Sequence, residues 1–224
     1  TITSTVSANT EAGFSVVGYT GTGSSFTVGH GLSSAPEMVF FKDRDSVVNW
    51  IVYHKDYAST QHIQKLNLND EQQDAGAGYA LTRGSSTLGI LDGIGINKLG
   101  SNHIALCFHS VEGYSAVGTY KGNNSNNGSF VFTGFRPAFV LLKRTNTTGA
   151  WKIFDNKRPD PHNVIDARIE ADNSGSESTN SSYSIDLISN GFKLRGTSAE
   201  QNGSGSTFIY LAFAEQPFKY ANAR

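Results

Sequence analysis

The chain has 224 residues and a formal net charge of −1, from 18 lysines and arginines against 19 aspartates and glutamates. This length fits one large domain or two small ones, and the balanced charge excludes the basic excess that is typical of nucleic-acid-binding proteins. Charged residues make up only 17% of the chain, and 24 glycines accompany many Ser, Thr and Asn. Such a composition favours turns and short strands over helices. Because no apolar run reaches the roughly 18 residues of a transmembrane helix, we expect no membrane span.

Short β-rich segments alternate with turn signals along the first half of the chain. A strand is expected after Pro36, and the turn that follows it leads to a segment containing Trp50, so these two segments predict a hairpin. The expected strands are residues 14–19, 25–28, 38–42 and 49–54.

The second half follows the same plan. Asn190-Gly191 is a strong signal for a tight turn between two strands. The expected strands are residues 129–132, 139–143, 151–154, 183–188, 192–194 and 207–213. Only residues 65–73 and 164–171 are candidates for short helices, so we predict an all-β fold with very little helix.

The two halves are copies of one another. Residues 38–42 match residues 139–143 at an offset of 101, which also aligns Trp50 with Trp151, the only two tryptophans of the chain. Further pairings are residues 92–96 with 190–194 at an offset of 98, and residues 104–108 with 209–213 at an offset of 105. Insertions in loops explain the changing offset, because loops lengthen at little free-energy cost.

The duplication predicts two tandem, homologous modules that resemble β-sandwiches or jelly rolls. We place the first at residues 11–115 and the second at residues 116–224, after an N-terminal extension or linker at residues 1–10. Residues 61–79 and 159–182 have no match in the other copy. Since loops carry variation on a rigid scaffold, these two segments are the expected place for recognition.

The matched tryptophans are an alternative ligand-binding feature, because an indole beside polar groups can stack on a sugar or a base. Each tryptophan equally suits packing of its hairpin onto the core, and this second interpretation is favoured because the flanking polar residues differ between the copies. The candidate ligand-binding residues are Trp50, Tyr53, His54, Trp151, Asp155 and Arg158.

Patterns typical of catalysis or of metal binding are not found in the sequence. The single cysteine, Cys107, lies in an apolar run and is expected to be a buried core thiol. None of the six histidines has metal-ligand spacing, and the acidic loop of Asp70, Glu71 and Asp74 lacks the alternating pattern of a calcium loop. We therefore expect no enzymatic activity, no catalytic residues, no metal and no cofactor.

Several longer runs resemble a known module. Residues 111–123, 133–144 and 212–224, together with residues 29–36, are similar to a duplicated β module at the C-termini of predicted tail-fibre and tail-tip proteins of marine and cyanobacterial phages. The resemblance extends from about Gly13 to the last residue. It implies a structural protein of the virion, on the tail or the capsid surface, with other virion proteins as partners and a trimeric homo-oligomer.

Three functions follow from this resemblance. The leading hypothesis is the receptor-binding module of a tail fibre, which binds a cell-surface glycan or protein through its loops. The alternative is a decoration or cement protein on the phage head. A depolymerase that cleaves capsular polysaccharide is the third and least supported hypothesis.

Overall fold

A computed structural model describes residues 1–158 and 162–216 of the chain. The described structure is about 45% strand and 6% helix, which confirms the predicted all-β fold. No helix in the described part of the chain is long and apolar enough to cross a membrane. The expected features at Pro159–Pro161 and Pro217–Arg224, including the end of the C-terminal motif, lie outside the described residues.

Both helix candidates were wrong. Lys65 ends a strand, and residues 167–170 form another strand, because both segments pair with neighbouring strands of a sheet. The helices are instead the single turns α1 (Ile94–Asn97) and α2 (Ala199–Asn202).

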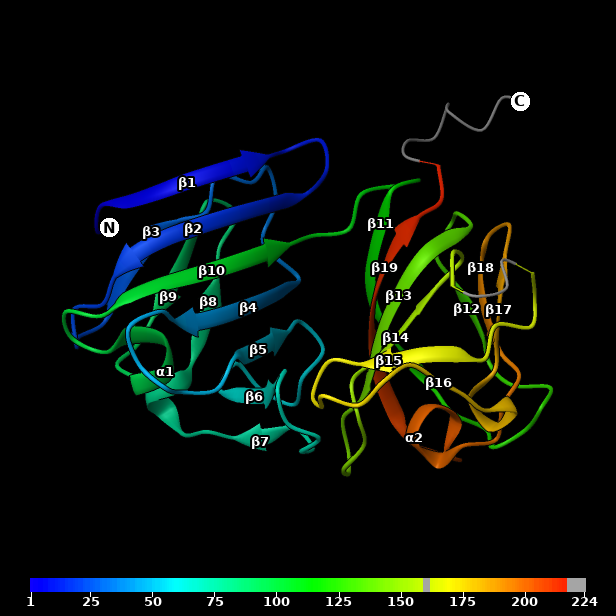
Figure 1. Ribbon diagram of the computed structural model, residues 1–224. Helices are drawn as coiled ribbons and strands as arrows, with labels where there is room; N and C mark the ends of the chain where they lie inside the picture. Colours follow the sequence, from blue (N-terminus) through cyan, green and yellow to red (C-terminus); the bar gives the residue numbers. More distant parts are fainter. Residues whose placement is uncertain (159–161, 217–224) are drawn as a thin grey trace. The chain divides into compact units, whose positions relative to one another are not determined.

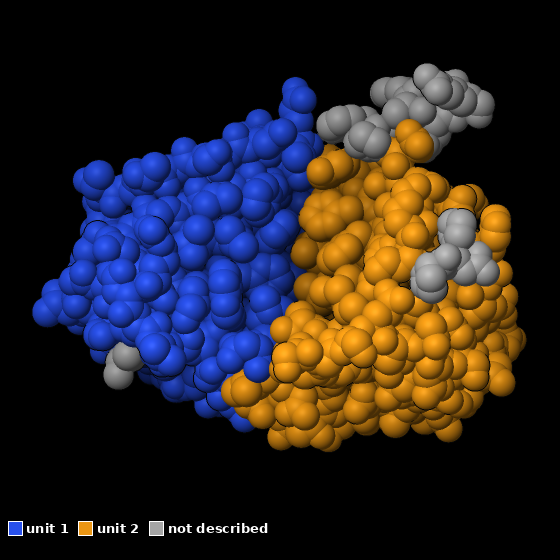
Figure 2. Space-filling model, in the orientation of Figure 1, with its two compact units in different colours: residues 1–67, 72–110 blue, residues 68–71, 111–224 orange. Residues whose placement is uncertain are grey.

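The chain forms two compact units, which Figure 2 colours separately. Unit 1 comprises Thr1–Asn67 and Gln72–Ser110, and unit 2 comprises Leu68–Glu71 and Val111–Arg224. The boundary after Ser110 thus falls five residues before the predicted one at residue 115. Residues 1–10 are not a linker, because Ser4–Asn9 form a strand that pairs along its whole length with the next strand of unit 1.

Unit 1 consists of two antiparallel sheets on either side of a hydrophobic core (Figure 1). The larger sheet has the order β1 (Ser4–Asn9), β2 (Phe14–Thr20), β10 (Asn102–Phe108), β4 (Met38–Asp43), β5 (Ile51–His54), β6 (His62–Lys65) and β7 (Gln73–Asp74). The smaller sheet has the order β3 (Phe26–Gly29), β9 (Thr87–Ile90) and β8 (Leu81–Arg83). A 3₁₀ turn, η1 (Ala77–Tyr79), precedes β8.

Unit 2 repeats this arrangement. Its larger sheet has the order β11 (Ser115–Lys121), β19 (Thr207–Ala214), β13 (Pro137–Arg144), β14 (Lys152–Asp155), β15 (Ala167–Glu170) and β16 (Ser178–Thr179). Its smaller sheet has the order β12 (Phe130–Phe132), β18 (Gly191–Leu194) and β17 (Ile185–Ile188), preceded by the 3₁₀ turn η2 (Ser181–Tyr183). The predicted hairpin forms between β17 and β18, with Ile188 opposite Gly191.

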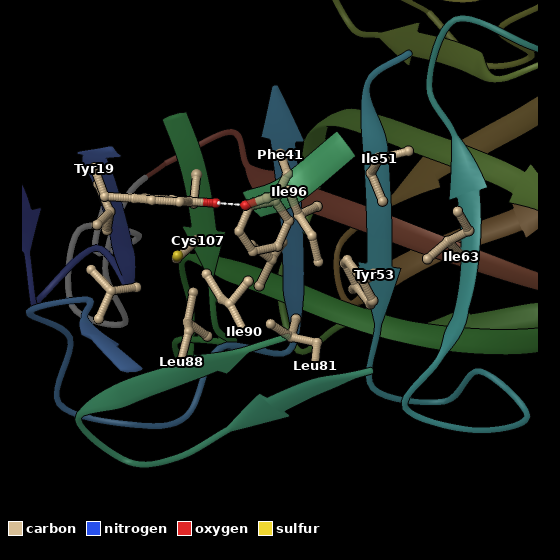
Figure 3. Packing of buried hydrophobic residues seen from close by; sticks show 14 of the residues in the cluster. Tyr19, Phe41, Ile51, Tyr53, Ile63, Leu81, Leu88, Ile90, Ile96 and Cys107 are labelled. Carbon is tan, nitrogen blue, oxygen red and sulfur yellow. Dashed lines mark hydrogen bonds between the residues drawn. The ribbon is translucent and has the colours of Figure 1, made fainter. Parts of the chain in front are cut away.

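Alternation of side chains builds the core of unit 1. Along β2 and β10 every second residue is buried, as expected for strands with one face on a core. Figure 3 shows this core, with the hydroxyl of Tyr19 donating to the backbone oxygen of Ile96 at 2.6 Å. The matching Tyr120 of unit 2 donates to the backbone oxygen of Gln201 at 2.8 Å. The same residue therefore ties the large sheet to the short helix in both units.

The strand orders give a complete correspondence between the units, and β1 is the extra strand of unit 1. The correspondence corrects one part of the predicted repeat. Residues 92–96 contain most of α1, whose counterpart is α2, whereas residues 190–194 contain β18, whose counterpart is β9. A glycine followed by alternating apolar residues occurs in both segments. The sequence match between them is therefore a local similarity and not a structural correspondence.

Two cross-strand neighbours show how the copies diverged while keeping their packing. Val17 lies opposite Ala105 in unit 1, and the corresponding pair in unit 2 is Gly118 opposite Tyr210. A Cβ on Gly118 would lie only 2.8 Å from the Tyr210 hydroxyl oxygen. A larger residue on one strand is thus compensated by a smaller one opposite, the volume-conserving kind of exchange that cores tolerate best.

A candidate ligand-binding pocket

Of the candidate residues of unit 1, Tyr53 and His54 line one small cavity of about 140 Å³, whereas Trp50 does not line it. Tyr53 is buried in the core, where its hydroxyl donates to the backbone oxygen of Tyr79 at 2.5 Å. Trp50 is half-buried just before β5, and its backbone N–H donates to Asn67 Oδ1 at 2.9 Å. Because Trp50 and Tyr53 are three positions apart on an extended segment, their side chains belong to opposite faces of the sheet. His54 lies next to Tyr53 and is also buried.

The structure brings two of the three candidate residues of unit 2 together. Trp151 is fully buried. Asp155 and Arg158 form an ion pair, with Nε and Oδ2 2.5 Å apart, and Arg158 also reaches Glu177 at 3.1 Å. Burial raises the pKa of Asp155, but hydrogen bonds from Lys157 and Arg158 hold it below its ordinary value. These two charges are therefore satisfied by the protein itself.

A different part of unit 1 offers a pocket, which we call the Gly95 pocket. It has a volume of about 540 Å³. Much of its lining comes from residues 61–79, the first of the two segments in which recognition was expected. The lining residues are Val47, Val48, Asn49, Ile51, Ile63, Lys65, Asn67, Gln73, Ala75, Tyr79 and Gly95.

The floor of the Gly95 pocket is apolar. Ile51 and Ile63 come from the neighbouring strands β5 and β6, and both belong to the core of unit 1 (Figure 3). Gly95, in α1, has no side chain above them. A Cβ built on Gly95 would lie 3.2 Å from Ile51 Cγ1 and 3.5 Å from the Tyr79 hydroxyl oxygen. Any longer side chain at this position would begin on the floor and extend into the pocket.

Amide side chains form the rim. Asn67 Nδ2 donates to Asn49 Oδ1 at 2.8 Å, and Lys65 Nζ donates to Gln73 Oε1 at 3.3 Å. Asn67 also holds the backbone of Trp50, so its position is fixed at both ends of its amide. The pocket thus combines an aliphatic floor with hydrogen-bonding groups around it, the usual composition of a small-molecule site.

Unit 2 has charged residues at the corresponding positions. Matching contacts fix the alignment of the two units. The backbone N–H of Trp151 donates to Asp172 as the N–H of Trp50 donates to Asn67. The register of β14 with β15 also repeats the register of β5 with β6. The resulting correspondences are Ile51 with Lys152, Ile63 with Arg168, Lys65 with Glu170, Tyr79 with Tyr183 and Gly95 with Glu200.

These residues of unit 2 form what we call the Lys152 network (Lys152, Arg168, Glu170, Tyr183 and Glu200). Lys152 Nζ lies 2.6 Å from Glu200 Oε2 and 3.4 Å from Glu170 Oε1. The Arg168 guanidinium lies 3.7 Å from the centre of the Tyr183 ring. Burial raises the pKa of Glu200, but the hydrogen bond and charge of Lys152 outweigh it and leave that pKa below its ordinary value. The space that is open in unit 1 is therefore filled by paired charges in unit 2.

A second hollow of about 560 Å³ lies against β1, β2 and β10 of unit 1. Strand residues such as Thr5, Gly18 and Ile104 line it. Its volume is similar to that of the Gly95 pocket, so volume does not distinguish the two. The Gly95 pocket is the stronger candidate because the other copy of the module fills the same place with its own side chains.

The structure locates the single cysteine and the side chains of the types that ligate metals. Within residues 1–158 and 162–216, no group of three His, Cys, Asp or Glu side chains is placed to hold a metal ion. Cys107 lies in the core, as predicted, and burial raises the pKa of its thiol to about 12. Its reactive thiolate form is therefore disfavoured at neutral pH.

Comparison with known proteins identifies one relationship. The model of a family described as Domain of unknown function (DUF7483) matches residues 1–217. The chain belongs to this family. Because the match starts at the first residue and includes both units, the DUF7483 domain in this chain comprises strand β1 and both copies of the module. No curated protein and no solved structure matches the chain.

Proposed function

We propose that the chain is a receptor-binding module of a phage tail fibre that binds a cell-surface glycan. The observation that carries the binding role is the Gly95 pocket, which is open in unit 1 while the Lys152 network fills its counterpart in unit 2. The placement in a phage tail rests on the resemblance of residues 111–123 and 133–144 to tail-fibre modules.

The open pocket costs unit 1 little stability, because Ile51 and Ile63 on its floor are each only 4% exposed. Unit 2 demonstrates that this fold accommodates a filled version with a glutamate in place of Gly95. A glycine here thus opens space that the fold does not need for its own stability.

The chemistry of the pocket suits a saccharide. Sugars present C–H faces and substituents that pack on apolar side chains, and hydroxyl groups that bond to amides. The Gly95 pocket provides both, with Ile51 and Ile63 below and Asn49, Asn67 and Gln73 around them. In an oligomeric fibre several such pockets would act together, so weak individual sites would still give firm attachment.

The test is binding of the purified chain to an array of bacterial surface glycans. We expect wild-type protein to bind a subset of these glycans and Gly95→Glu to lose that binding. Leu99→Glu, which adds the same charge at an exposed position of unit 1 outside the pocket, is the matched control and should bind as wild type. Absence of binding by the wild-type chain, or equal binding by all three proteins, would refute the proposal.

The place in the virion needs its own measurement. Electron microscopy of phage particles labelled with antibodies against this chain should mark the distal tail. Label on the capsid would refute the tail-fibre assignment and favour the decoration protein on the phage head.

A further inference from the structure

We infer that the Gly95 pocket takes the acetamido group of an N-acetylated sugar. This inference rests on the proposed function and specifies its ligand. It follows from comparing the Gly95 pocket of unit 1 with the Lys152 network of unit 2. The Glu200 side chain of unit 2 occupies the place that a ligand would take in unit 1.

The first step concerns a hydrogen-bond acceptor. In unit 2 the Tyr183 hydroxyl donates to Glu200 Oε2 at 3.2 Å. Its counterpart Tyr79 accepts the Gly95 N–H at 3.3 Å, and no acceptor for the hydroxyl's own proton is found among residues 1–158 and 162–216. The proton is therefore available to an oxygen atom of the ligand at the position where unit 2 places a carboxylate.

The second step concerns charge. The Glu200 carboxylate is balanced by Lys152 at 2.6 Å, whereas the corresponding position in unit 1 is Ile51. Arg168 is likewise replaced by Ile63. An anionic group on the two isoleucines would lose its hydration and would lie where unit 1 has neither of the cations, Lys152 and Arg168, that surround Glu200 in unit 2, which is unfavourable. Lys65 belongs to the rim, where it bonds to Gln73. The group that reaches the floor of the pocket is therefore neutral.

The third step concerns shape and the remaining polar groups. An acetamido group has a carbonyl oxygen that can accept the Tyr79 proton and a methyl group that can pack on Ile51 and Ile63. Its N–H needs an acceptor, and Asn49 Oδ1, which accepts one hydrogen bond from Asn67, has a second lone pair on the rim. A hydroxyl substituent would supply the acceptor but not the methyl group, so plain hexoses fit less well.

The inference is tested with matched saccharides. The glucosamine disaccharide corresponds to chitobiose without its acetyl groups and has basic amines in their place, and the neutral analogue cellobiose has hydroxyl groups instead. Titration calorimetry should show binding of the acetylated sugar that is at least tenfold tighter than that of either analogue. Saturation-transfer NMR on the acetylated sugar should give its strongest signal at the acetyl methyl protons.

Two variants with one change each locate the interaction. Tyr79→Phe removes the proposed donor and should weaken binding of the acetylated sugar about tenfold. Tyr183→Phe makes the same change in the Lys152 network and should leave binding unaltered. Gly95→Glu is a further variant, which blocks the pocket and keeps the Tyr79 side chain. Thermal unfolding of all three variants shows whether each remains folded.

The outcomes separate this inference from the proposed function. Equal affinity for acetylated and deacetylated sugars, with binding still lost in Gly95→Glu, would overturn the acetamido assignment and leave glycan binding in place. Unchanged affinity in a folded Tyr79→Phe variant would overturn the assignment of the acceptor oxygen. A wild-type chain that binds no saccharide, on the array or in solution, would overturn the proposed function itself.

Discussion

Asn97 and Asn202 are fully buried, and three side-chain hydrogen bonds of Asn97 have a counterpart at Asn202. Each ends the short helix of its unit. Asn97 Oδ1 accepts the backbone N–H of Thr22 at 2.7 Å, and its Nδ2 donates to the backbone oxygens of Ser24 and Leu91. One amide thus joins the turn at Thr22 and Ser24 to the segment from Leu91 to Asn97, which lies far along the chain from that turn.

The bonds of Asn202 follow the same plan. Its Oδ1 accepts the N–H of Asn123 at 3.0 Å, and its Nδ2 donates to the backbone oxygens of Ser125 and Gly196, both at 2.9 Å. This contact fixes the helix that carries Gly95 in unit 1 and Glu200 in unit 2. The position of the candidate pocket therefore depends on it.

Replacement of Asn97 by alanine should destabilise the protein strongly. Two backbone carbonyls and two backbone N–H groups, those of Thr22 and Gly23, would lose their partner, and each buried unsatisfied group costs about 1–3 kcal/mol. We expect Asn97→Ala to lower the free energy of unfolding by about 3 kcal/mol in urea denaturation. Asn126→Ala, at an exposed position, is the control and should stay within about 0.5 kcal/mol. An equal effect of the two variants would show that the buried amide is not the cause.

Two glycines of unit 1 differ in how closely the backbone of a neighbouring segment approaches them, so their alanine variants can be compared. A Cβ on Gly21 would lie 2.2 Å from the backbone oxygen of Lys98, whereas a Cβ on Gly18 has the Thr5 oxygen at 3.9 Å as its nearest neighbour. Gly21→Ala must therefore displace backbone and should lower the free energy of unfolding by at least about 2 kcal/mol. Gly18→Ala should be neutral or stabilising by up to about 1 kcal/mol. The same denaturation experiment compares them, and similar midpoints for both variants would contradict the close approach at Gly21.

The Lys152 network predicts a dependence of stability on pH. Burial raises the pKa of Glu200, but Lys152 and Tyr183 lower it more, so the folded pKa lies below that of the unfolded chain. Such a carboxylate stabilises the fold above its unfolded pKa and loses that contribution as the pH falls through its folded pKa. The melting temperature of wild type should therefore exceed that of Glu200→Gln at pH 7.

The same comparison at acidic pH completes the test. The difference in melting temperature should shrink as the pH falls below about 4.5, the ordinary pKa of glutamate. Glu71→Gln changes an exposed glutamate and serves as the control. A difference between wild type and Glu200→Gln that persists unchanged at low pH would mean that shape, and not charge, determines the effect.

The sequence by itself predicted the all-β fold and the repeat of the modules' strands. These features are visible because they are local: alternation marks β2 and β10, Asn190 marks the turn between β17 and β18, and the two tryptophans align. Strand β1 was missed because its polar residues resemble a linker, and only pairing with β2 makes it a strand.

Recognition was expected in residues 61–79 and 159–182 because these segments have no match in sequence. In the structure the described parts of both segments contain equivalent elements, β6 with β15, β7 with β16 and η1 with η2. Their side chains differ while their backbones correspond. The first of these segments, residues 61–79, provides much of the lining of the Gly95 pocket. The segments contain strands and a 3₁₀ turn as well as loops.

Only the tertiary structure decided that Gly95 and Glu200 hold the same position. Loops of unequal length separate them from the matched strands, and the segment around Gly95 aligns in sequence with β18 instead of α2. Sheet register and the buried amides of Asn97 and Asn202 fix the two helices, and both are contacts between residues far apart in the chain. Contacts between distant residues determine whether the pocket is open or filled. The sequence by itself therefore determined the scaffold, and only the tertiary structure determined the site.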